Sequence, residues 1–430
     1  MRTATALRRA TRPAVITLLA TISLGALLGC AERPTAPPND PALALASANR
    51  SPIDKQAGAA ATLAWQKTAR DLVASHKFAP NVATRIYALH SMALYAAVVA
   101  AGRGGDGDDD LGGGRAAYEA QRGAIAAASV QLLSSISEFA DAVPALEAQL
   151  AAYGADASGK THPQFTRGVA IGRAAGNVMS NWAKNDGYSL KWDESMRNAP
   201  GDGIWQGIPG TPPSGYQYPT VKPYFLTSQK QFRAPPPPAY LSTRFNTDLA
   251  EVRNISQNRT AEQIRIANDW NLAAGTITTL GHWNEQAALF IDEQQFDERA
   301  ASHLFALMDA AVLDATIGCW ETKFLYLMLR PTMADPLHIT TVYTLPNHPS
   351  YPSGHSCLSS AAATVLSQYF PAHAAQLQAD VIEAGLSRIY GGIHYRFDIE
   401  AGQALGRSTA EWAMDYDRRF GVLSALNSGR

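Results

Sequence analysis

The sequence predicts an all-α fold, a helical bundle with one long ordered loop region. From about residue 59, apolar residues recur at intervals of three and four, which is the spacing of amphipathic helices. Runs that alternate apolar and polar residues, typical of strands, are scarce, and only 338–344 is a candidate. Alanine is abundant and charged residues make up 17% of the 430-residue chain, which suits a helical protein with a large core.

The periodic stretches form two groups, separated by a region without periodicity. The first group contains the predicted helices 60–75, 82–101, 116–136, 142–153 and 166–184. The second group contains 244–256, 260–280, 283–294, 296–330, 355–370, 372–388 and 394–415. Pro331 is expected to end the helix over 296–330, because proline does not continue a helix.

The region between the two groups, 186–242, is rich in Gly, Pro, Trp and Tyr and ends in four consecutive prolines. A stretch of this length without periodicity is either disordered or functional. Its aromatic residues favour an ordered loop that packs on the helices and covers a pocket. These residues are Trp192, Trp205, Tyr216, Tyr218, Tyr224 and Phe225.

The N-terminus has the pattern of an export signal. Residues 1–29 contain four arginines and no acidic residue, with an apolar run over about 14–28. This run is too short to span a bilayer comfortably, and we expect no membrane span after residue 29. Cys30 at the junction resembles the lipidated cysteine of bacterial lipoprotein signals, and an ordinary secretory signal cleaved nearby is the alternative.

This interpretation predicts how the chain is divided. Residues 1–29 form a lipoprotein-type signal peptide, 30–55 a flexible tether, 56–290 an N-terminal helical region and 291–418 a C-terminal domain. We expect an exported lipoprotein that faces the periplasm from the outer membrane, with the lipid as its only membrane anchor. The net charge of −1 argues against a nucleic-acid partner. Export permits a disulfide between Cys319 and Cys357, but two buried thiols are equally compatible with the sequence.

Three short segments in the last third of the chain together predict a pocket for a tetrahedral oxyanion. They contribute three fixed cations, two imidazoles and a carboxylate. Burying three cations without an anion would be costly, so we expect an anionic ligand among them. The segments are Lys323 to Arg330-Pro331, then Pro352-Ser353-Gly354-His355, then Ser387-Arg388 to His394 and Asp398.

Each segment taken alone also has a purely structural explanation. Lys323 and Arg330 are seven residues apart, two turns on one helix face, and a solvated basic stripe is the alternative. Ser353 is placed as a helix N-cap, and the free amides at that helix start would also cradle an anion. Asp398 follows His394 by one turn, so it can accept from one ring nitrogen and leave the other for the ligand. Together, the three segments favour a functional site over separate structural roles.

The segments resemble the signature of the phosphatidic acid phosphatase type 2 and vanadium-dependent haloperoxidase superfamily, and of its bacterial haloperoxidase-like lipoproteins. The resemblance implies a helical bundle that holds phosphate or vanadate in one pocket, because vanadate mimics the transition state of phosphoryl transfer. It makes His394 the axial ligand of vanadium or, in a phosphatase, the nucleophile. His355 would be the acid–base residue, and Asp398 would orient His394. The residues implied to bind the equatorial oxygens are Lys323, Arg330, Ser353, Gly354 and Arg388.

Nearby residues favour the haloperoxidase branch of this superfamily. Trp320 precedes Lys323 by three residues. The haloperoxidase branch is similar at this position, where it has an aromatic residue beside the halide site. His348 opens the segment 348–355, which is similar to the form found in algal bromoperoxidases. Both residues are halide-site candidates, with packing as the alternative role. The segments 222–225 and 282–284 also resemble parts of bacterial haloperoxidase-like proteins.

We therefore expect a vanadate-dependent haloperoxidase-like enzyme that oxidises halide with hydrogen peroxide at a vanadate bound to His394. The alternative is an exported acid phosphatase that hydrolyses phosphate monoesters through a phosphohistidine at the same site. A third hypothesis, of another class, is a surface lipoprotein that binds an oxyanion without turnover. That hypothesis would leave His355 and Asp398 without a task. In each case the partner is a small molecule.

Overall fold

Helices build the described part of the chain, which confirms the predicted all-α class. The structure is a computed structural model that describes residues 58–102 and 114–427. Over these residues there is no β-strand, only isolated bridges. The predicted strand at 338–344 is therefore wrong, and this segment is irregular. The predicted signal peptide, Cys30 and the tether lie outside the described residues.

The first predicted group of helices is present almost as expected. It comprises α3 (Ala60–Ser75), α4 (Pro80–Ala101), α5 (Arg115–Leu133), α6 (Val143–Gly154) and α7 (Pro163–Lys184). The second group comprises α8 (Thr243–Asn258), α9 (Ala261–Asp269), α10 (Thr278–Glu293), α11 (Glu298–Tyr326), α12 (Pro331–Ala334), α13 (Gly354–Tyr369), α14 (Ala374–Tyr390), α15 (Arg396–Phe420) and α16 (Ser424–Asn427). These helices belong to one unit, Asn39–Arg430, and the division at residue 291 stays a prediction.

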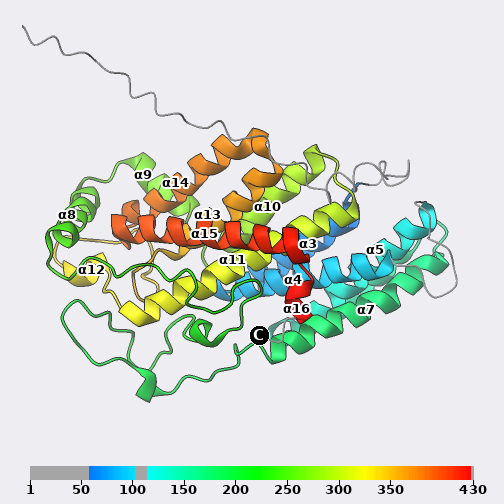
Figure 1. The fold of residues 1–430 in the computed structure, drawn as a ribbon, viewed down its shortest axis with the longest axis horizontal. Helices are drawn as coiled ribbons and strands as arrows, with labels where there is room; N and C mark the ends of the chain where they lie inside the picture. Colours follow the sequence, from blue (N-terminus) through cyan, green and yellow to red (C-terminus); the bar gives the residue numbers. More distant parts are fainter. Residues whose placement is uncertain (1–57, 103–113, 428–430) are drawn as a thin grey trace, which may run out of the picture. The chain divides into compact units, whose positions relative to one another are not determined.

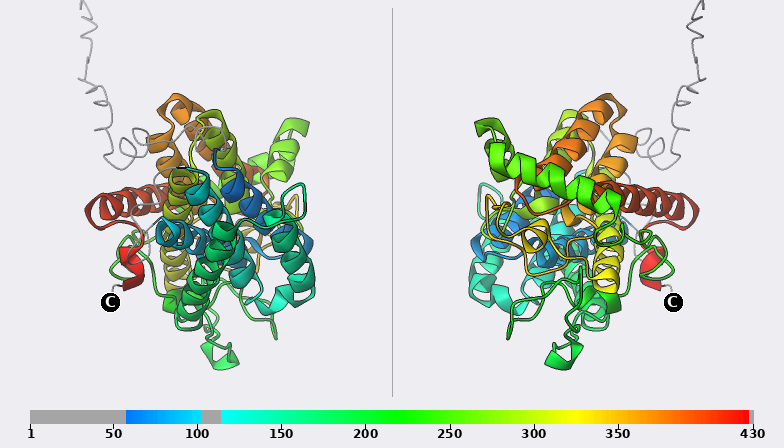
Figure 2. Two further views of the ribbon diagram at one scale, coloured as in Figure 1. Left: turned by 90° about the vertical axis from the view of Figure 1, so that its right-hand side faces the viewer. Right: turned by 90° about the vertical axis from the view of Figure 1, so that its left-hand side faces the viewer.

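The central helix is α11, which packs against α4, α13 and α15 (Figures 1 and 2). Nearly every residue from Ala300 to Lys323 is buried. By length and composition, α4 and α11 could each cross a membrane, which the sequence analysis did not anticipate. However, 72% of the most apolar 18-residue stretch of α4 and 94% of that of α11 are buried inside the structure. Their apolar surface is therefore covered by neighbouring helices, as in the core of a bundle.

The loop 186–242 is ordered and packs on the helices, as predicted, along one edge of the bundle in Figures 1 and 2. Tyr224 and Phe225 are buried at its centre. The carboxylate of Asp314 on α11 accepts hydrogen bonds from the amides of Tyr224 and Phe225, both at 2.7 Å, and of Leu226 at 3.1 Å. One buried carboxylate thus fixes the loop to the central helix.

The predicted helix over 296–330 is wrong at its C-terminal end. α11 ends at Tyr326, and Leu327 adopts the left-handed conformation with φ 51°. The amide of Trp205 donates to Leu327 O, and the amide of Leu329 donates to Gly203 O at 3.0 Å. The backbone of the long loop thus pairs with residues 327–329 and displaces the helix. Arg330 consequently lies in an extended segment, and the following proline begins α12 instead of ending α11.

The predicted helix over 260–280 is also wrong, because two helices occupy this region. α9 ends at Asp269, α10 begins at Thr278, and the turn 270–277 lies between them. Gly275 in this turn has φ 94°, a conformation that favours glycine. This turn contributes residues to the candidate site.

Candidate active site

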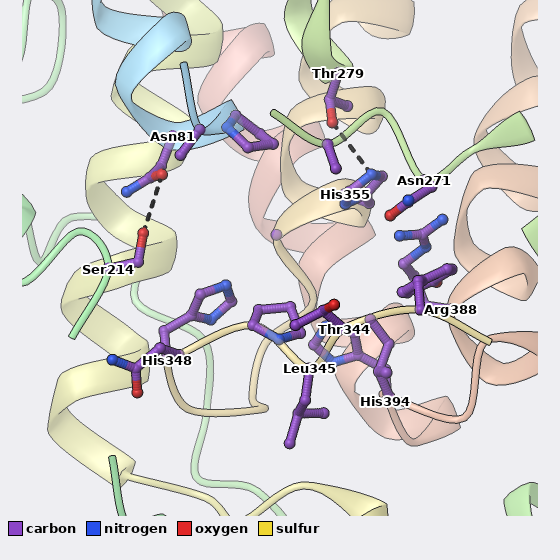
Figure 3. A pocket seen from close by; sticks show the side chains of 18 of the residues that line it. Asn81, Ser214, Asn271, Thr279, Thr344, Leu345, His348, His355, Arg388 and His394 are labelled. Carbon is purple, nitrogen blue, oxygen red and sulfur yellow. Dashed lines mark hydrogen bonds between the residues drawn. The ribbon is translucent and has the colours of Figure 1, made fainter. Parts of the chain in front are cut away.

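The three segments singled out in the sequence converge on one cavity of about 260 Å³ (Figure 3). The side chains of Trp320, His348, His355, Arg388 and His394 line it, together with Gly354. Lys323, Arg330, Ser353 and Asp398 do not line the cavity but lie in the layer directly behind its wall. Residues from outside these segments complete the lining, among them Asn81, Ser214, Asn271 and Thr279.

His394 and Asp398 form the pair that their spacing predicts. Asp398 Oδ2 lies 2.7 Å from His394 Nδ1, and Ser350 Oγ donates to the same carboxylate oxygen at 2.6 Å. Burial lowers the pKa of His394 well below its usual value, and the charges of Arg330 and Lys323 lower it further. A neutral ring that donates from Nδ1 to Asp398 keeps its Nε2 lone pair available for a ligand.

Lys323 is fully buried, and its ammonium group is held by backbone carbonyls. Lys323 Nζ donates to Pro349 O at 3.0 Å, to Ser350 O at 2.8 Å and to Pro352 O. Burial lowers the pKa of Lys323 to about 8. Because an ammonium has three donors, these contacts satisfy it and fix the segment that leads into α13.

Arg330 contacts both imidazoles at this end of the cavity. Its Nη1 lies 3.4 Å from His394 Nε2, and its Nη2 lies 3.1 Å from His348 Nδ1. It also donates to the carbonyls of His348 at 3.0 Å and Ile393 at 2.8 Å. Burial lowers the pKa of Arg330 to about 10. Arg330 therefore reaches the site although it is not on the helix that carries Lys323.

Arg388, at the end of α14, approaches the cavity from the side of the turn 270–277 (Figure 3). Its Nε donates to Ser387 Oγ at 2.9 Å, and its Nη2 donates to the carbonyls of Ala267 and Trp270. The guanidinium carbon lies 5.1 Å from the ring centroid of Tyr343. Burial lowers the pKa of Arg388.

Ser353 is the N-cap of α13, as predicted, and accepts from the amide of Ser356 at 3.4 Å. The amides of Gly354 and His355 in the first turn have no recorded partner in the described ranges. A Cβ at Gly354 would lie 3.1 Å from the Trp320 ring, so glycine keeps this helix start open to the cavity. A helix N-terminus with free amides is suited to bind an anion.

His355 faces the cavity from the first turn of α13. Its Nε2 lies 3.2 Å from Thr279 Oγ1 at the start of α10. Burial lowers the pKa of His355 well below its usual value, and the charge of Arg388 lowers it further. A neutral imidazole in this position is able to accept a proton from a bound ligand.

Trp320 and His348 lie side by side on the cavity wall, with ring centroids 5.2 Å apart. Trp320 Nε1 donates to Ser214 O at 2.9 Å, which ties the long loop to this wall. Cys319, the residue before Trp320, and Cys357 are both buried free thiols, so the structure has no disulfide between them. Burial and the neighbouring Cys319 thiol raise the pKa of Cys357.

The charges around the cavity fit a bound tetrahedral oxyanion such as vanadate or phosphate. Lys323, Arg330 and Arg388 are at most 2% exposed, and none of them forms an ion pair with a carboxylate in the described part of the chain. The nearest carboxylate, Asp398, is engaged by His394 and Ser350. An anion in the cavity would compensate this excess positive charge, which burial makes unfavourable.

Sequence reasoning missed several residues of this site, among them Ser350 and Thr279. Ser350 lies in the segment 348–355, but nothing in its local pattern indicates that its hydroxyl donates to Asp398. Thr279 carried no signal, because it fell at the C-terminal end of the predicted helix over 260–280, whereas in the structure it lies in the first turn of α10. The turn that brings Thr279 to His355 is visible only in the structure.

A helical bundle whose buried cations and imidazoles surround one small cavity defines a class of proteins, those suited to bind a small oxyanion. The sequence profile of the PAP2 superfamily matches residues 300–421, which contain all three segments. This match, together with the relatives described below, is consistent with the PAP2 and vanadium haloperoxidase superfamily, and the relatives are enzymes.

Two groups of proteins resemble the chain. A non-specific acid phosphatase of Salmonella typhi is 43% identical over 63 residues, 15% of this chain and 25% of that protein. A non-specific acid phosphatase of Providencia stuartii is 28% identical over 197 residues, 43% of this chain and 76% of that protein. The chain thus matches only a quarter of the Salmonella phosphatase.

Solved structures of haloperoxidases match over more of the chain. The crystal structure of a bacterial vanadium-dependent iodoperoxidase has a TM-score of 0.68 and 26% identity, covering 84% of this chain and 96% of that chain. An apo-type bacterial vanadium-dependent chloroperoxidase has a TM-score of 0.65 and 16% identity, covering 82% and 96%. The likeness to the chloroperoxidase supports the fold alone.

Proposed function

We propose that this protein is a vanadate-dependent haloperoxidase that oxidises halide with hydrogen peroxide. The observation that carries the proposal is the likeness to the iodoperoxidase, which extends over 96% of that structure and includes helices well before the PAP2 match. The place of Trp320 and His348 on the cavity wall supports it, because the Arg330 guanidinium contacts His348 there and supplies positive charge for an anion. Both are proposed to form the halide site.

In this proposal the oxyanion is held by groups that the cavity already brings together. His394 Nε2, oriented by Asp398, would ligate the oxyanion, and the amides at the start of α13 and the Arg388 guanidinium would donate hydrogen bonds to its oxygens. Arg330 would also lie close to the bound oxyanion, because its Nη1 is next to His394 Nε2. Lys323 acts on the same site by its charge and by fixing the segment before α13.

Bound vanadate would supply Lewis-acid activation of hydrogen peroxide toward the halide. The chain supplies the proton transfers and the enclosure. His355, neutral because of its burial, accepts a proton from hydrogen peroxide and returns it to the departing hydroxide. Asp398 keeps the proton on Nδ1 of His394, so Nε2 stays available as a ligand.

An acid phosphatase is the second candidate, because the sequence relatives with curated functions are phosphatases. The same geometry serves that reaction. His394 Nε2 would attack the phosphorus as the bond to the ester oxygen breaks, and the leaving alkoxide would take a proton from His355, which would have to enter this reaction protonated. The cations would stabilise the charge on the transferring phosphoryl group.

The experiment that separates these functions uses purified protein in phosphate-free buffer, with and without vanadate. Bromination or iodination of a phenol dye that requires vanadate, peroxide and halide would support the haloperoxidase. Hydrolysis of p-nitrophenyl phosphate that vanadate inhibits would instead support the phosphatase. Tight phosphate binding without turnover in either assay would support a non-catalytic oxyanion-binding lipoprotein. His394→Ala should abolish whichever activity is found, and His373→Ala, a surface histidine paired with Glu293, serves as control.

We also propose that the protein is exported as a lipoprotein with Cys30 as the lipidated residue. The basic start, the apolar run and the cysteine in the first thirty residues support this proposal. Fractionation of cells that express the wild type and Cys30→Ser tests it. The wild type should be found in the outer membrane, whereas the variant should lose membrane association.

A further inference from the structure

His355 is held by a part of the chain that lies before the PAP2 match. Its Nε2 pairs with Thr279 Oγ1 at 3.2 Å, and the backbone of Trp270 and Asn271 lies beside the ring. Thr279 is 1% exposed, lines the cavity, and its hydroxyl has no other recorded partner among the described residues (Figure 3). The hydroxyl is thus directed at this one imidazole.

The same stretch of chain also holds Arg388. The Nη2 of Arg388 donates to the carbonyls of Ala267, at 3.4 Å, and Trp270. Figure 3 shows Arg388, His355 and Asn271 together on one side of the cavity. The segment from the end of α9 to the start of α10 therefore contacts both a proposed anion-binding residue and the proposed acid–base residue.

The backbone around Thr279 is fixed by the core of the bundle. The Tyr87 hydroxyl on α4 donates to Ile277 O at 2.8 Å. Thr278 has φ 65°, a conformation that β-branched residues rarely adopt and that persists only where the surroundings enforce it. A Cβ at Gly281 would lie 2.7 Å from the Tyr87 hydroxyl, so this approach of α4 to α10 requires glycine. Thr279 is presented to the cavity by a rigid support.

We propose that Thr279 is a positioning residue that fixes the ring orientation of His355 for proton transfer. The proposal rests on the acid–base role proposed above for His355. Without the hydroxyl, Nε2 would lose its side-chain partner among the described residues, and only the backbone of the 270–277 turn beside the ring would restrict its orientation. Proton transfer depends on such geometry, because a base must lie within hydrogen-bonding distance of the proton it accepts.

Thr279→Val removes the hydroxyl and keeps the shape of the side chain. We expect kcat to fall on the order of 10-fold, as for other residues that orient a functional histidine, while the affinity for vanadate stays unchanged. Thr279→Ser restores the hydroxyl and should restore kcat. Thr409→Val is the matched control, because within the described ranges the buried Thr409 hydroxyl bonds only to Leu405 O of its own helix.

A double-mutant cycle distinguishes positioning from a general structural effect. If Thr279 acts through His355, then Thr279→Val should have almost no further effect in a His355→Ala background. Equal losses in both backgrounds would overturn the proposal. So would failure of Thr279→Ser to restore kcat, or a loss of vanadate affinity that parallels the loss of kcat.

The proposal is also tested without turnover, which separates it from the proposed function. In ¹⁵N-histidine spectra of the phosphate-bound protein, His355 should populate one tautomer in the wild type and in Thr279→Ser. Thr279→Val should give averaged ring shifts, and His355→Ala assigns the signal. If halide oxidation is absent and phosphate esters are hydrolysed, the same cycle is measured with p-nitrophenyl phosphate. If neither reaction occurs, the proposed function fails, and the spectra alone decide whether Thr279 fixes the ring.

Discussion

Asp398 Oδ2 lies 2.7 Å from His394 Nδ1, and the side chain of Asp398 is completely buried. Burial raises the pKa of Asp398 to about 6, while its hydrogen bond from Ser350 and the nearby Lys323 charge lower it. Asp398 also accepts from the amide of Tyr395 as part of a capping box at the start of α15. The helix start that positions this carboxylate therefore also fixes the orientation of the His394 ring.

Replacing Asp398 tests this relationship. In Asp398→Asn the amide is able to donate as well as accept, so the ring of His394 is no longer restricted to one tautomer. We expect vanadate affinity and activity to fall about 10- to 100-fold, the usual cost of losing the partner of a ligating histidine. Asp248→Asn is the control. Asp248 on α8 is also a buried carboxylate, and it accepts from the amide of Phe397, which lies next to Asp398 on α15. Titration with vanadate measures the affinity, and an unchanged value in Asp398→Asn would contradict the assigned role.

The parts of the site that depend on local spacing could be predicted from the sequence. Asp398 follows His394 by four residues, and Ser353 precedes an apolar periodic run, so both contacts follow from helix geometry. The fold class followed from the same periodicity. These features require no knowledge of which distant segments meet.

The parts that depend on long-range pairing could not be predicted. The apolar run 324–329 continues the helical pattern, yet the helix ends at Tyr326 because the backbone at 203–205 pairs with residues 327–329. The turn 270–277 interrupts a stretch that reads as one helix, and only Gly275 marks it locally. Thr279 reaches His355 because of that turn. A single sequence does not reveal which distant backbone groups compete with a helix.

Lys323 should contribute to stability as well as to the charge of the site. In Lys323→Met the buried carbonyls of Pro349, Ser350 and Pro352 lose their shared donor. Three buried carbonyls without a donor should cost more than the removal of one buried charge gains, so we expect the free energy of unfolding to fall by about 2 kcal/mol. Urea unfolding without added anion measures this loss. A variant as stable as the wild type would show that these carbonyls find other partners.

Asp314 is expected to control the order of the long loop. In Asp314→Ala the amides of Tyr224, Phe225 and Leu226 lose their acceptor in a buried environment. We expect a loss of about 2 kcal/mol in the free energy of unfolding and faster proteolysis within 186–242. Asp156→Ala, which removes an exposed carboxylate that caps a surface turn, serves as control. Unchanged cleavage in Asp314→Ala would mean that the aromatic packing alone holds the loop.

Asp309 should make the stability of the protein depend on pH below neutrality. It lies on α11, completely buried, and accepts from Ser91 and, at 3.3 Å, from Asn284. Burial raises its pKa from 3.8 to about 7. Between these two values the folded protein binds a proton that the unfolded chain has released. The free energy of unfolding should therefore decrease as pH rises from about 4 to about 7, and this contribution should level off above that range.

Asp309→Asn isolates this contribution, because an amide does not titrate. Urea unfolding at several pH values between 4 and 8 should give a flatter dependence for the variant than for the wild type. Asp71→Asn on the exposed face of α3 serves as control, since it removes a carboxylate paired only with Lys67 on the surface. An equal slope for Asp309→Asn and the wild type would show that Asp309 is ionised throughout this range. Its charge would then have to be stabilised by Arg70, the nearby buried arginine on α3.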